Sequence, residues 1–235
     1  MFKNAWAGHW NGHVPAGDPH TRARETIKPT GTIIRVKYPS KKNGRMIHAE
    51  SPLERDAVFF FEASHHVLRY REQPTTIYYP DGARLRRHTP DFELVMDTGE
   101  ILYIEIKHSN SLTHEKVRHK LSCIERHFRA SGINYLVLTE EVIRQEPRLS
   151  NLRKICAGMQ RIWPTADAIQ NALSQIYQHF PTTLQQANEL LAKHHLNVFS
   201  LFVTGELSLD LTNPITPETN VNITKENNNA YLWLS

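Results

Sequence analysis

The sequence has few cysteines and no long apolar run. Its two cysteines, Cys123 and Cys156, show neither the spacing of a metal site nor a disulfide framework, which favours a reducing compartment. No stretch approaches the length of a membrane span, and the N-terminus lacks the apolar core of a secretion signal. We therefore expect a cytoplasmic protein with no membrane association. Its 235 residues, 40% of them hydrophobic, are enough for one large domain or two small ones.

Acidic residues are scarce in the N-terminal part of the chain. Residues 1–50 contain nine Lys or Arg but three acids, whereas the whole chain has a net charge of only +4. This excess of positive charge is typical of a surface that contacts phosphates, although a solvated basic arm would have the same composition. The candidate DNA contacts in this part and on a later basic helix are Arg35, Lys37, Lys41, Lys42, Arg45, Lys116 and Lys120.

Composition and periodicity divide the chain into four regions. Residues 1–31 show no clear period and are predicted to form a basic irregular arm. Residues 32–147 contain predicted strands and helices in an order that is compatible with an α/β domain. Residues 148–212 are predicted to form a separate, mostly helical domain, and residues 213–235 a polar tail with an apolar end.

The most informative stretch is His88–Lys107, which predicts two strands joined by a turn. Apolar residues alternate along the first strand, and Gly99 allows the positive φ that such a turn often needs. Asp91 stands at the start of the first strand. Glu105 and Lys107 stand near the end of the second and project to the same face. A hairpin therefore brings two carboxylates and an ammonium group together at one end of a small sheet.

Two neighbouring carboxylates repel each other unless a cation lies between them. Mg²⁺ prefers carboxylate oxygens as ligands, and Mn²⁺ is expected to substitute for it. With an adjacent lysine to stabilise developing charge, such a site suits the hydrolysis of phosphodiesters. The alternative interpretation of these residues is a solvated hairpin rim with an ordinary ion pair.

A helix that begins after Ser51 supplies a third acid. Ser51 is a typical N-cap, Pro52 occupies the first helical position, and Glu54 completes a capping box. Capping alone explains a glutamate at this position. The functional interpretation makes Glu54 a third carboxylate of the metal site, delivered by the helix that precedes the sheet.

The remaining elements of the α/β domain are predicted from periodicity and turn residues. Gln73 lies next to the site by strand order and is a weaker candidate site residue, whereas His88 is equally well explained as the end of a strand. The segments concerned are strands over residues 32–38, 67–73, 75–79 and 135–138, a basic turn over 39–46, and an amphipathic helix over 113–130.

The motifs of this domain resemble those of a known nuclease family. Pro90-Asp91 followed by Glu105-Ile106-Lys107 resembles the PD-(D/E)xK motif of restriction-enzyme-like nucleases. The order of PSKKNGRMIHAESPLERD, REQP, HTPDF and IEIKHS resembles TnsA, the endonuclease subunit of heteromeric cut-and-paste transposases. The resemblance implies a restriction-endonuclease-like mixed central sheet flanked by helices. It also implies a Mg²⁺-dependent DNA endonuclease that cleaves the 5′ strand at transposon ends, with a TnsB-type transposase and a TnsC-type AAA+ ATPase as partners.

The same resemblance implies roles for individual residues. Glu54 aligns with the helical catalytic acid, Asp91 with the metal-bridging aspartate, and Lys107 with the catalytic lysine. Glu105 occupies a position where TnsA proteins carry Gln or Glu, and a glutamate there is expected to bind the metal directly. The expected metal ligands are accordingly Glu54, Asp91, Glu105 and the carbonyl group of Ile106.

The C-terminal third is predicted to contain helices over 149–160 and 167–180 and from 181 onward, and then a small hairpin around Gly205. This order resembles a winged helix and the C-terminal domain of TnsA proteins. Winged helices often read DNA, but the third helix carries only one lysine and is a poor phosphate-binding surface. The resemblance to TnsA implies instead that this domain docks to a TnsC-type protein. The apolar end at Tyr231–Leu234 is either a partner contact or part of the domain's packing.

Two other functions stay open at this point. The first is a stand-alone restriction- or repair-type nuclease with the same fold. The second is a non-catalytic DNA-binding adaptor, which is disfavoured because an adaptor has no use for a repulsive cluster of acids.

Overall fold

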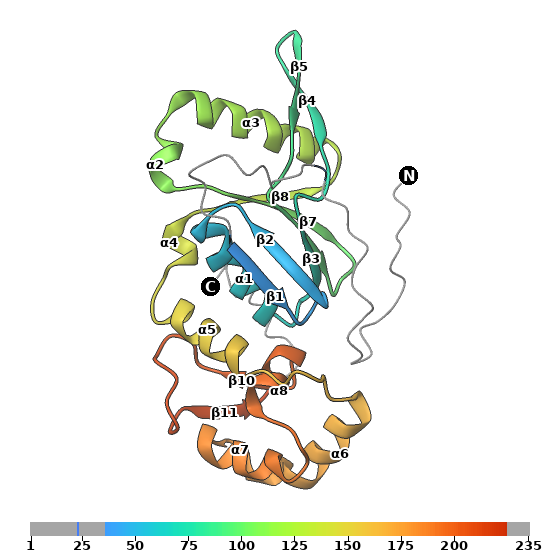
Figure 1. The fold of residues 1–235 in the computed structure, drawn as a ribbon, viewed down its shortest axis with the longest axis vertical. Coiled ribbons are helices and arrows are strands. Elements are labelled where there is room, and N and C mark those ends of the chain that lie inside the picture. The colour runs from blue at the N-terminus through green and yellow to red at the C-terminus, as the bar shows by residue number, and fades with distance from the viewer. Residues whose placement is uncertain (1–22, 24–35, 225–235) are drawn as a thin grey trace.

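The computed structural model describes residue 23 and residues 36–224 (Figure 1). The predicted basic arm except Ala23, the predicted DNA contact Arg35 and the apolar C-terminal end lie outside the described residues. The strands are β1 (Val36–Ser40), β2 (Arg45–Ala49), β3 (Val67–Glu72), β4 (Ile77–Asp81), β5 (Arg84–His88), β6 (Phe92–Met96), β7 (Ile101–Ile106), β8 (Asn134–Leu138), β9 (Thr182–Thr183), β10 (Leu207–Leu209) and β11 (Asn220–Ile223). The helices are α1 (Pro52–Ala63), α2 (Ser109–Leu112), α3 (Glu115–Ala130), α4 (Glu140–Ile143), α5 (Arg148–Gly158), α6 (Ala166–Ile176), the 3₁₀ helix η1 (Tyr177–His179), α7 (Leu184–Ala192) and α8 (Val198–Thr204).

A four-stranded mixed sheet in the order β3-β6-β7-β8 forms the centre of the fold. The predicted hairpin is present as β6 and β7, which are antiparallel and pair Phe92 with Ile104. Gly99 in its turn has a φ of +83°, a conformation that glycine adopts without steric cost. On their outer sides β3 pairs antiparallel with β6, and β8 pairs parallel with β7.

Helices cover both faces of this sheet, which confirms the predicted mixed α/β architecture (Figure 1). On one face α1 packs through Phe61, whose ring centroid lies 5.2 Å from that of Phe92. On the other face Phe128 of α3 stacks on Tyr103 at 4.9 Å and on Tyr135 at 5.0 Å. The alternation of side chains along β6 and β7 therefore supplies two apolar layers, one for each helix.

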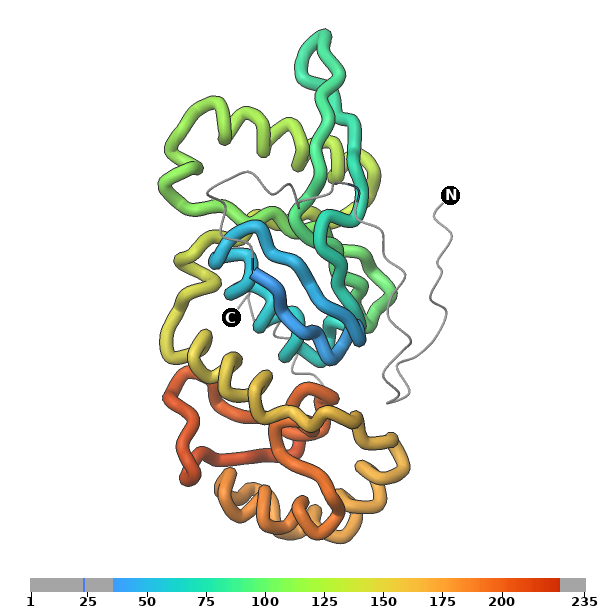
Figure 2. Tube along the Cα trace, in the orientation of Figure 1, coloured from blue at the N-terminus to red at the C-terminus, as the bar shows by residue number. Residues whose placement is uncertain are grey.

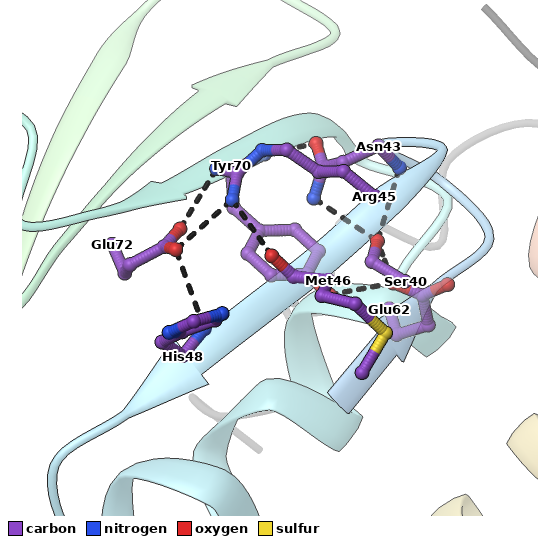
Figure 3. A network of polar contacts seen from close by, with 8 residues as sticks. All are labelled: Ser40, Asn43, Arg45, Met46, His48, Glu62, Tyr70 and Glu72. Carbon is purple, nitrogen blue, oxygen red and sulfur yellow. Dashed lines mark hydrogen bonds and ion pairs between the residues drawn. The ribbon is translucent and has the colours of Figure 1, made fainter. Parts of the chain in front are cut away.

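The β1–β2 hairpin is fixed to α1 by a buried carboxylate (Figure 3). Glu62 is fully buried and accepts hydrogen bonds from Ser40 Oγ at 2.8 Å and from Tyr70 Oη at 2.6 Å. It also accepts from the backbone N–H groups of Lys41 at 2.7 Å and Lys42 at 3.0 Å. These bonds satisfy the carboxylate and define the turn, so the segment predicted as a basic turn is part of the packed structure.

Three predicted DNA contacts are consequently engaged within the protein. Lys42 is only 4% exposed and donates to the carbonyl groups of Phe61 and Ser64. Lys41 donates to the carbonyl group of Met159, and Arg45 forms a salt bridge of 2.7 Å with Glu72. The burial of Lys42 contradicts its assignment to a DNA surface, whereas the assignment of the partly exposed Lys41 and Arg45 stays a prediction. Burial and backbone acceptors, which the charge pattern does not reveal, hold these side chains in place.

The C-terminal third is joined to the central sheet by a continuous apolar core. Helix α5 begins at Arg148, next to the predicted domain boundary, and packs against α1. Leu149, Leu152 and Ile155 of α5 belong to the same buried cluster as Phe61 of α1 and Leu201 of α8. The two parts therefore pack on each other rather than being separated by a linker.

The predicted hairpin around Gly205 is wrong. Residues 198–204 form α8, and Gly205, with a φ of +92°, ends that helix. Strand β10 pairs instead with β11, which also pairs with β9. Strand β11 lies in the segment predicted as a polar tail, where the polar composition masked the fully buried Val221 and the buried Ile215.

Among the described residues, no helix is both long enough and apolar enough to cross a bilayer.

Asp56 joins the sheet-covering helix α1 to the C-terminal helices. Its side chain is 2% exposed and forms ion pairs of 2.8 Å with Arg55, 2.9 Å with Arg144 and 2.8 Å with Arg153. Burial alone would raise the pKa of Asp56, but the hydrogen bonds from these arginines outweigh it and lower that pKa. The carboxylate is therefore ionised and shared by three segments of the chain.

Asp56→Asn is expected to lower the free energy of unfolding by about 2 kcal/mol, because the buried carboxylate loses charge-assisted hydrogen bonds to three arginines that are themselves partly hydrated. Urea denaturation followed by circular dichroism measures the change. The matched control is Asp167→Asn, which alters an exposed aspartate in the first turn of α6 and should change stability by less than about 0.5 kcal/mol. Equal stability of the two variants would contradict the role given to Asp56.

His65 makes the stability of the contact with the C-terminal third depend on pH. Its ring lies against Gly205, and burial, with a smaller effect of the nearby His66 charge, lowers the pKa of His65 to about 4. Between this pKa and the ordinary value of 6.5, the unfolded chain binds more protons than the folded chain. Stability should therefore fall as the pH drops from 6.5 to 4, by up to about 3 kcal/mol from this group.

Urea denaturation of the wild type and of His65→Gln at pH 7 and at pH 4.5 tests this expectation. The difference between the two pH values should be smaller in His65→Gln, whereas His179→Gln, at an exposed position, should behave as the wild type. An unchanged pH dependence in His65→Gln would contradict the role of His65.

Candidate active site

Asp91 is fixed at the end of the central sheet by the backbone of the neighbouring strand. Its Oδ2 atom accepts a hydrogen bond of 2.7 Å from the N–H group of Ile106, and its own carbonyl group accepts from Gln73 N–H at 2.8 Å. The residue therefore bridges the ends of β3 and β7 just before β6 begins. Its position follows from the strand register, as the sequence predicted.

Glu105 lies on β7 with its side chain almost completely buried. Its Oε1 atom forms an ion pair of 2.7 Å with Lys107 Nζ, and its Oε2 atom lies 2.9 Å from His88 Nε2. His88 is the last residue of β5 and is itself buried. The structure thus gives His88 a definite contact, whereas the sequence explained it equally well as a strand end.

Lys107 follows β7 and places its ammonium group between the acids. Its Nζ atom lies 2.7 Å from Glu105 Oε1 and 3.6 Å from Asp91 Oδ2, and it donates to the carbonyl group of Ile106 at 2.9 Å. The backbone N–H group of Lys107 donates to Leu138, which anchors this residue to β8. Three of the four groups predicted to bind metal therefore face a single cation.

Glu54 approaches the same place from the start of α1. Ser51 Oγ accepts from Glu54 N–H at 3.1 Å, as the predicted N-cap requires. The Glu54 carboxylate accepts from Glu50 N–H at 2.7 Å and from Ser51 Oγ at 3.1 Å. In a standard capping box the glutamate accepts from the N–H group of the N-cap, which is Ser51, whereas here it accepts from the preceding residue, Glu50. The Glu54 side chain also lines the cavity.

The surroundings of the three acids shift their pKa values in different directions. Burial, reinforced by the charge of Glu105, raises the pKa of Asp91 to about 8. Burial also raises the pKa of Glu54, although hydrogen bonds from Glu50 and Ser51 oppose it. Burial would raise the pKa of Glu105 too, but its bond to His88 and the Lys107 charge outweigh that effect and lower the pKa. Such a spread is typical of functional sites and favours the binding of a cation.

An open cavity of about 390 Å³ is lined by these groups. Its basic residues include Arg87 at the base of β5 and Lys120 on α3, neither of which is covered by other parts of the described structure. Sequence analysis missed Arg87, although three arginines within β5 were a usable signal. The residues that line the cavity are Ala23, Glu50, Glu54, Thr76, Arg87, His88, Thr89, Asp91, Glu105, Lys107 and Lys120.

The donor set fits a hard divalent cation. Asp91 Oδ2, Glu105 Oε1 and the Ile106 carbonyl oxygen all surround the position of the Lys107 ammonium group. Carboxylate and carbonyl oxygens are the ligands that Mg²⁺ and Mn²⁺ prefer. The ammonium group stands where a cation is required, yet burial and the charge of Glu105 still raise the pKa of Asp91 in its presence.

The other predicted residues lie at different distances from the site. Lys120 lines the cavity, and Lys116 is exposed one helical turn earlier on α3. Lys37 is exposed on β1 and does not line the cavity, and Arg35 lies outside the described residues. Gln73 is buried next to Asp91 and contacts it through the backbone, and its side chain does not line the cavity.

A second group of potential metal ligands occurs in the described part of the chain. Asp81 Oδ1, His119 Nε2 and Cys123 Sγ lie within 4.8 Å of one another. Asp81 is already paired with His119 at 2.8 Å and with Arg86 at 3.1 Å. This ion-pair network accounts for the charges, and we assign it the structural role of holding β4 against α3.

Carboxylates and a lysine lie at the end of a mixed sheet, with a further acid from the preceding helix. This is the arrangement that the PD-(D/E)xK resemblance of the sequence implies. Residues 64–140 match the family described as TnsA-like endonuclease N terminal. The match includes Asp91, Glu105 and Lys107, and it confirms the resemblance of this part of the chain to TnsA-like nucleases. A comparison with curated proteins found no match.

The two roles of Glu54 can be separated experimentally. Glu54→Gln keeps one oxygen that can accept the bond from Glu50 N–H but removes a charge, so Mn²⁺ affinity measured by calorimetry should fall at least about tenfold. Its melting temperature should stay within about 2 °C of the wild type. Thr165→Ala, which removes the N-cap of α6 away from the cavity, is the reciprocal control. It should lower stability by about 1 kcal/mol and leave the Mn²⁺ affinity unchanged. A loss of stability without a loss of affinity in Glu54→Gln would reduce Glu54 to a helix cap.

Proposed function

We propose that this protein is a TnsA-like, metal-dependent DNA endonuclease. The observation that carries the proposal is the convergence of Glu54, Asp91, Glu105 and Lys107 on one open cavity. The family match over residues 64–140 supports the nuclease class independently of that geometry. A solvated hairpin rim would not bury Glu105 to 1% exposure or hold it between a lysine and a histidine.

The proposed cofactor is Mg²⁺, for which Mn²⁺ substitutes. Its ligands would be the carboxylates of Glu54, Asp91 and Glu105 and the carbonyl group of Ile106. When bound, the ion would supply Lewis acidity toward the scissile phosphate. The protein's own contribution is a set of oxygens that β6, β7 and α1 hold in place before substrate arrives.

Lys107 is proposed to act on the substrate. Its ammonium group is held by Glu105 and Asp91, and the charges of these two acids raise the pKa of Lys107 despite its burial. It therefore stays protonated at neutral pH. A cation bound by these acids would free the ammonium group to contact a phosphate oxygen or to orient the attacking water. Arg87 and Lys120 would hold the flanking phosphates at the rim of the cavity.

His88 is proposed to position Glu105 rather than to contact the substrate. Its Nε2 atom lies 2.9 Å from Glu105 Oε2, which leaves Oε1 directed toward Lys107 and the cavity. A histidine that orients a ligating carboxylate in this way fixes the direction of the oxygen that binds the cation.

The finer biological role is proposed from the family likeness. The enzyme would cleave the 5′ strand at transposon ends, while a TnsB-type transposase acts on the other strand and a TnsC-type AAA+ ATPase regulates the complex. In the C-terminal third, the order α6, β9, α7, α8, β10, β11 is compatible with a winged helix. Helix α7 has only one lysine, Lys193 at its C-cap. This scarcity of positive charge supports docking to a protein in preference to reading DNA.

Asp91→Asn should abolish cleavage of transposon-end DNA in a mixture with the two partner proteins, with a rate loss of at least about a hundredfold. The substitution replaces the Asp91 carboxylate by an amide of nearly the same size, so the site loses an acidic group while its geometry is kept. Strand-resolved gel analysis measures the rate, and calorimetry with Mn²⁺ should show the parallel loss of binding. Asp97→Asn, in the exposed turn at the other end of the same hairpin, is the matched control and should cleave as the wild type. Normal cleavage by Asp91→Asn would refute the nuclease proposal.

A further inference from the structure

Strands β4 and β5 form an arm that projects beyond the central sheet. They pair only with each other among the described strands, in the register Tyr78 with Arg87 and Pro80 with Leu85. Figures 1 and 2 show that the arm extends past the end of α3, away from the C-terminal third. A two-stranded projection of this kind exposes both of its faces unless another element covers one of them.

One face of the arm is fixed to α3. Tyr79 is 4% exposed and packs with Ile124 and Phe128 of that helix. Asp81, two residues farther along the same face, pairs with His119 of α3 at 2.8 Å. The arm is therefore held in one orientation by apolar packing and by an ion pair, rather than being a loose loop.

The opposite face is uncovered. Directly opposed residues in an antiparallel pair share a face, so Tyr78, Pro80, Leu85 and Arg87 lie together on the side away from α3. Tyr78 is 59% exposed and Leu85 is 70% exposed, which is unusual for large apolar side chains on a strand. Asp81, the acidic residue of β4, lies on the face toward α3. The uncovered face therefore carries one charged residue, the positively charged Arg87.

This face reaches the candidate active site through Arg87, which lines the cavity. His88, the next residue, lies on the other face of the arm and contacts Glu105. Tyr78 lies beside Arg87 in the register, and Leu85 lies farther out along the arm. A ligand that occupies the cavity and extends along the arm would meet first a positive charge, then an aromatic ring, and then an aliphatic side chain.

We propose that this face of the arm, made of Tyr78, Pro80, Leu85 and Arg87, binds the major groove of duplex DNA beside the scissile phosphate. The proposal rests on the nuclease function proposed above. The major groove admits a two-stranded ribbon, and apolar side chains there contact thymine methyl groups while an arginine contacts phosphate. The positive charge of the face and its continuity with the cavity favour DNA over a protein partner as the occupant.

The test measures duplex binding by the full chain. Fluorescence anisotropy with a short labelled duplex of mixed sequence, in EDTA to prevent cleavage, gives Kd for the wild type and for Tyr78→Ala/Leu85→Ala. The double variant should bind at least about tenfold more weakly, because it loses the burial of two large side chains. Leu68→Ala, at a partly exposed leucine near the other end of the sheet, should bind as the wild type.

The salt dependence identifies the kind of contact. The apolar double variant should keep the wild-type slope of log K against log salt, because it loses no phosphate contact. Arg87→Gln should reduce that slope by about one. The matched control is Arg161→Gln, at an exposed arginine in the C-terminal third, which should leave the slope unchanged. Protection of guanine N7 from methylation, lost in the double variant, identifies the major groove.

The outcomes separate the arm from the catalytic proposal. Wild-type duplex affinity in the double variant, or a wild-type chain that binds no duplex, would overturn the arm proposal. So would a double variant that loses assembly with a partner protein but not DNA affinity. Asp91→Asn should retain arm-dependent affinity while losing cleavage. If Asp91→Asn cleaves normally, the nuclease proposal fails, whereas the anisotropy result still decides whether the arm binds DNA.

Discussion

The ammonium group of Lys107 makes the end of the β6–β7 hairpin compatible with a folded chain. Strand pairing brings Asp91 and Glu105 together in a buried position, where their mutual repulsion would otherwise raise the free energy of the fold. The lysine offsets this repulsion without removing it. The excess of negative charge that remains follows from the same strand register that forms the central sheet, and the proposed binding of a divalent cation would compensate it.

Most of the nuclease part was predictable because local signals and tertiary packing agree there. The turn at Gly99, the N-cap at Ser51 and the amphipathic pattern of α3 each specify an element by its own residues. Once β6 and β7 pair, the positions of Asp91 and Glu105 follow from the register. Placing Glu54 required more, since only the packing of α1 on the sheet brings its carboxylate to the cavity.

The errors have a common physical origin, which is that charge and polarity in the sequence do not report burial. The sequence predicts Lys42 to be a surface lysine, but its ammonium group is buried and donates hydrogen bonds to two backbone carbonyl groups. Burial lowers the pKa of Lys42 to about 8. Strand β11 reads as a tail because Asn220 and Asn222 alternate with its apolar residues. In both cases long-range contacts decide the outcome, through Glu62 in the first and through β10 in the second.

The position of His88 has a mechanical consequence. It is at once the last residue of the projecting arm and the hydrogen-bond partner of the most deeply buried acid in the site. Because the arm is packed against α3 beyond this point, the imidazole ring is fixed both by the arm and by the acid it contacts. The direction of the Glu105 carboxylate therefore depends on contacts made outside the site, between the arm and α3.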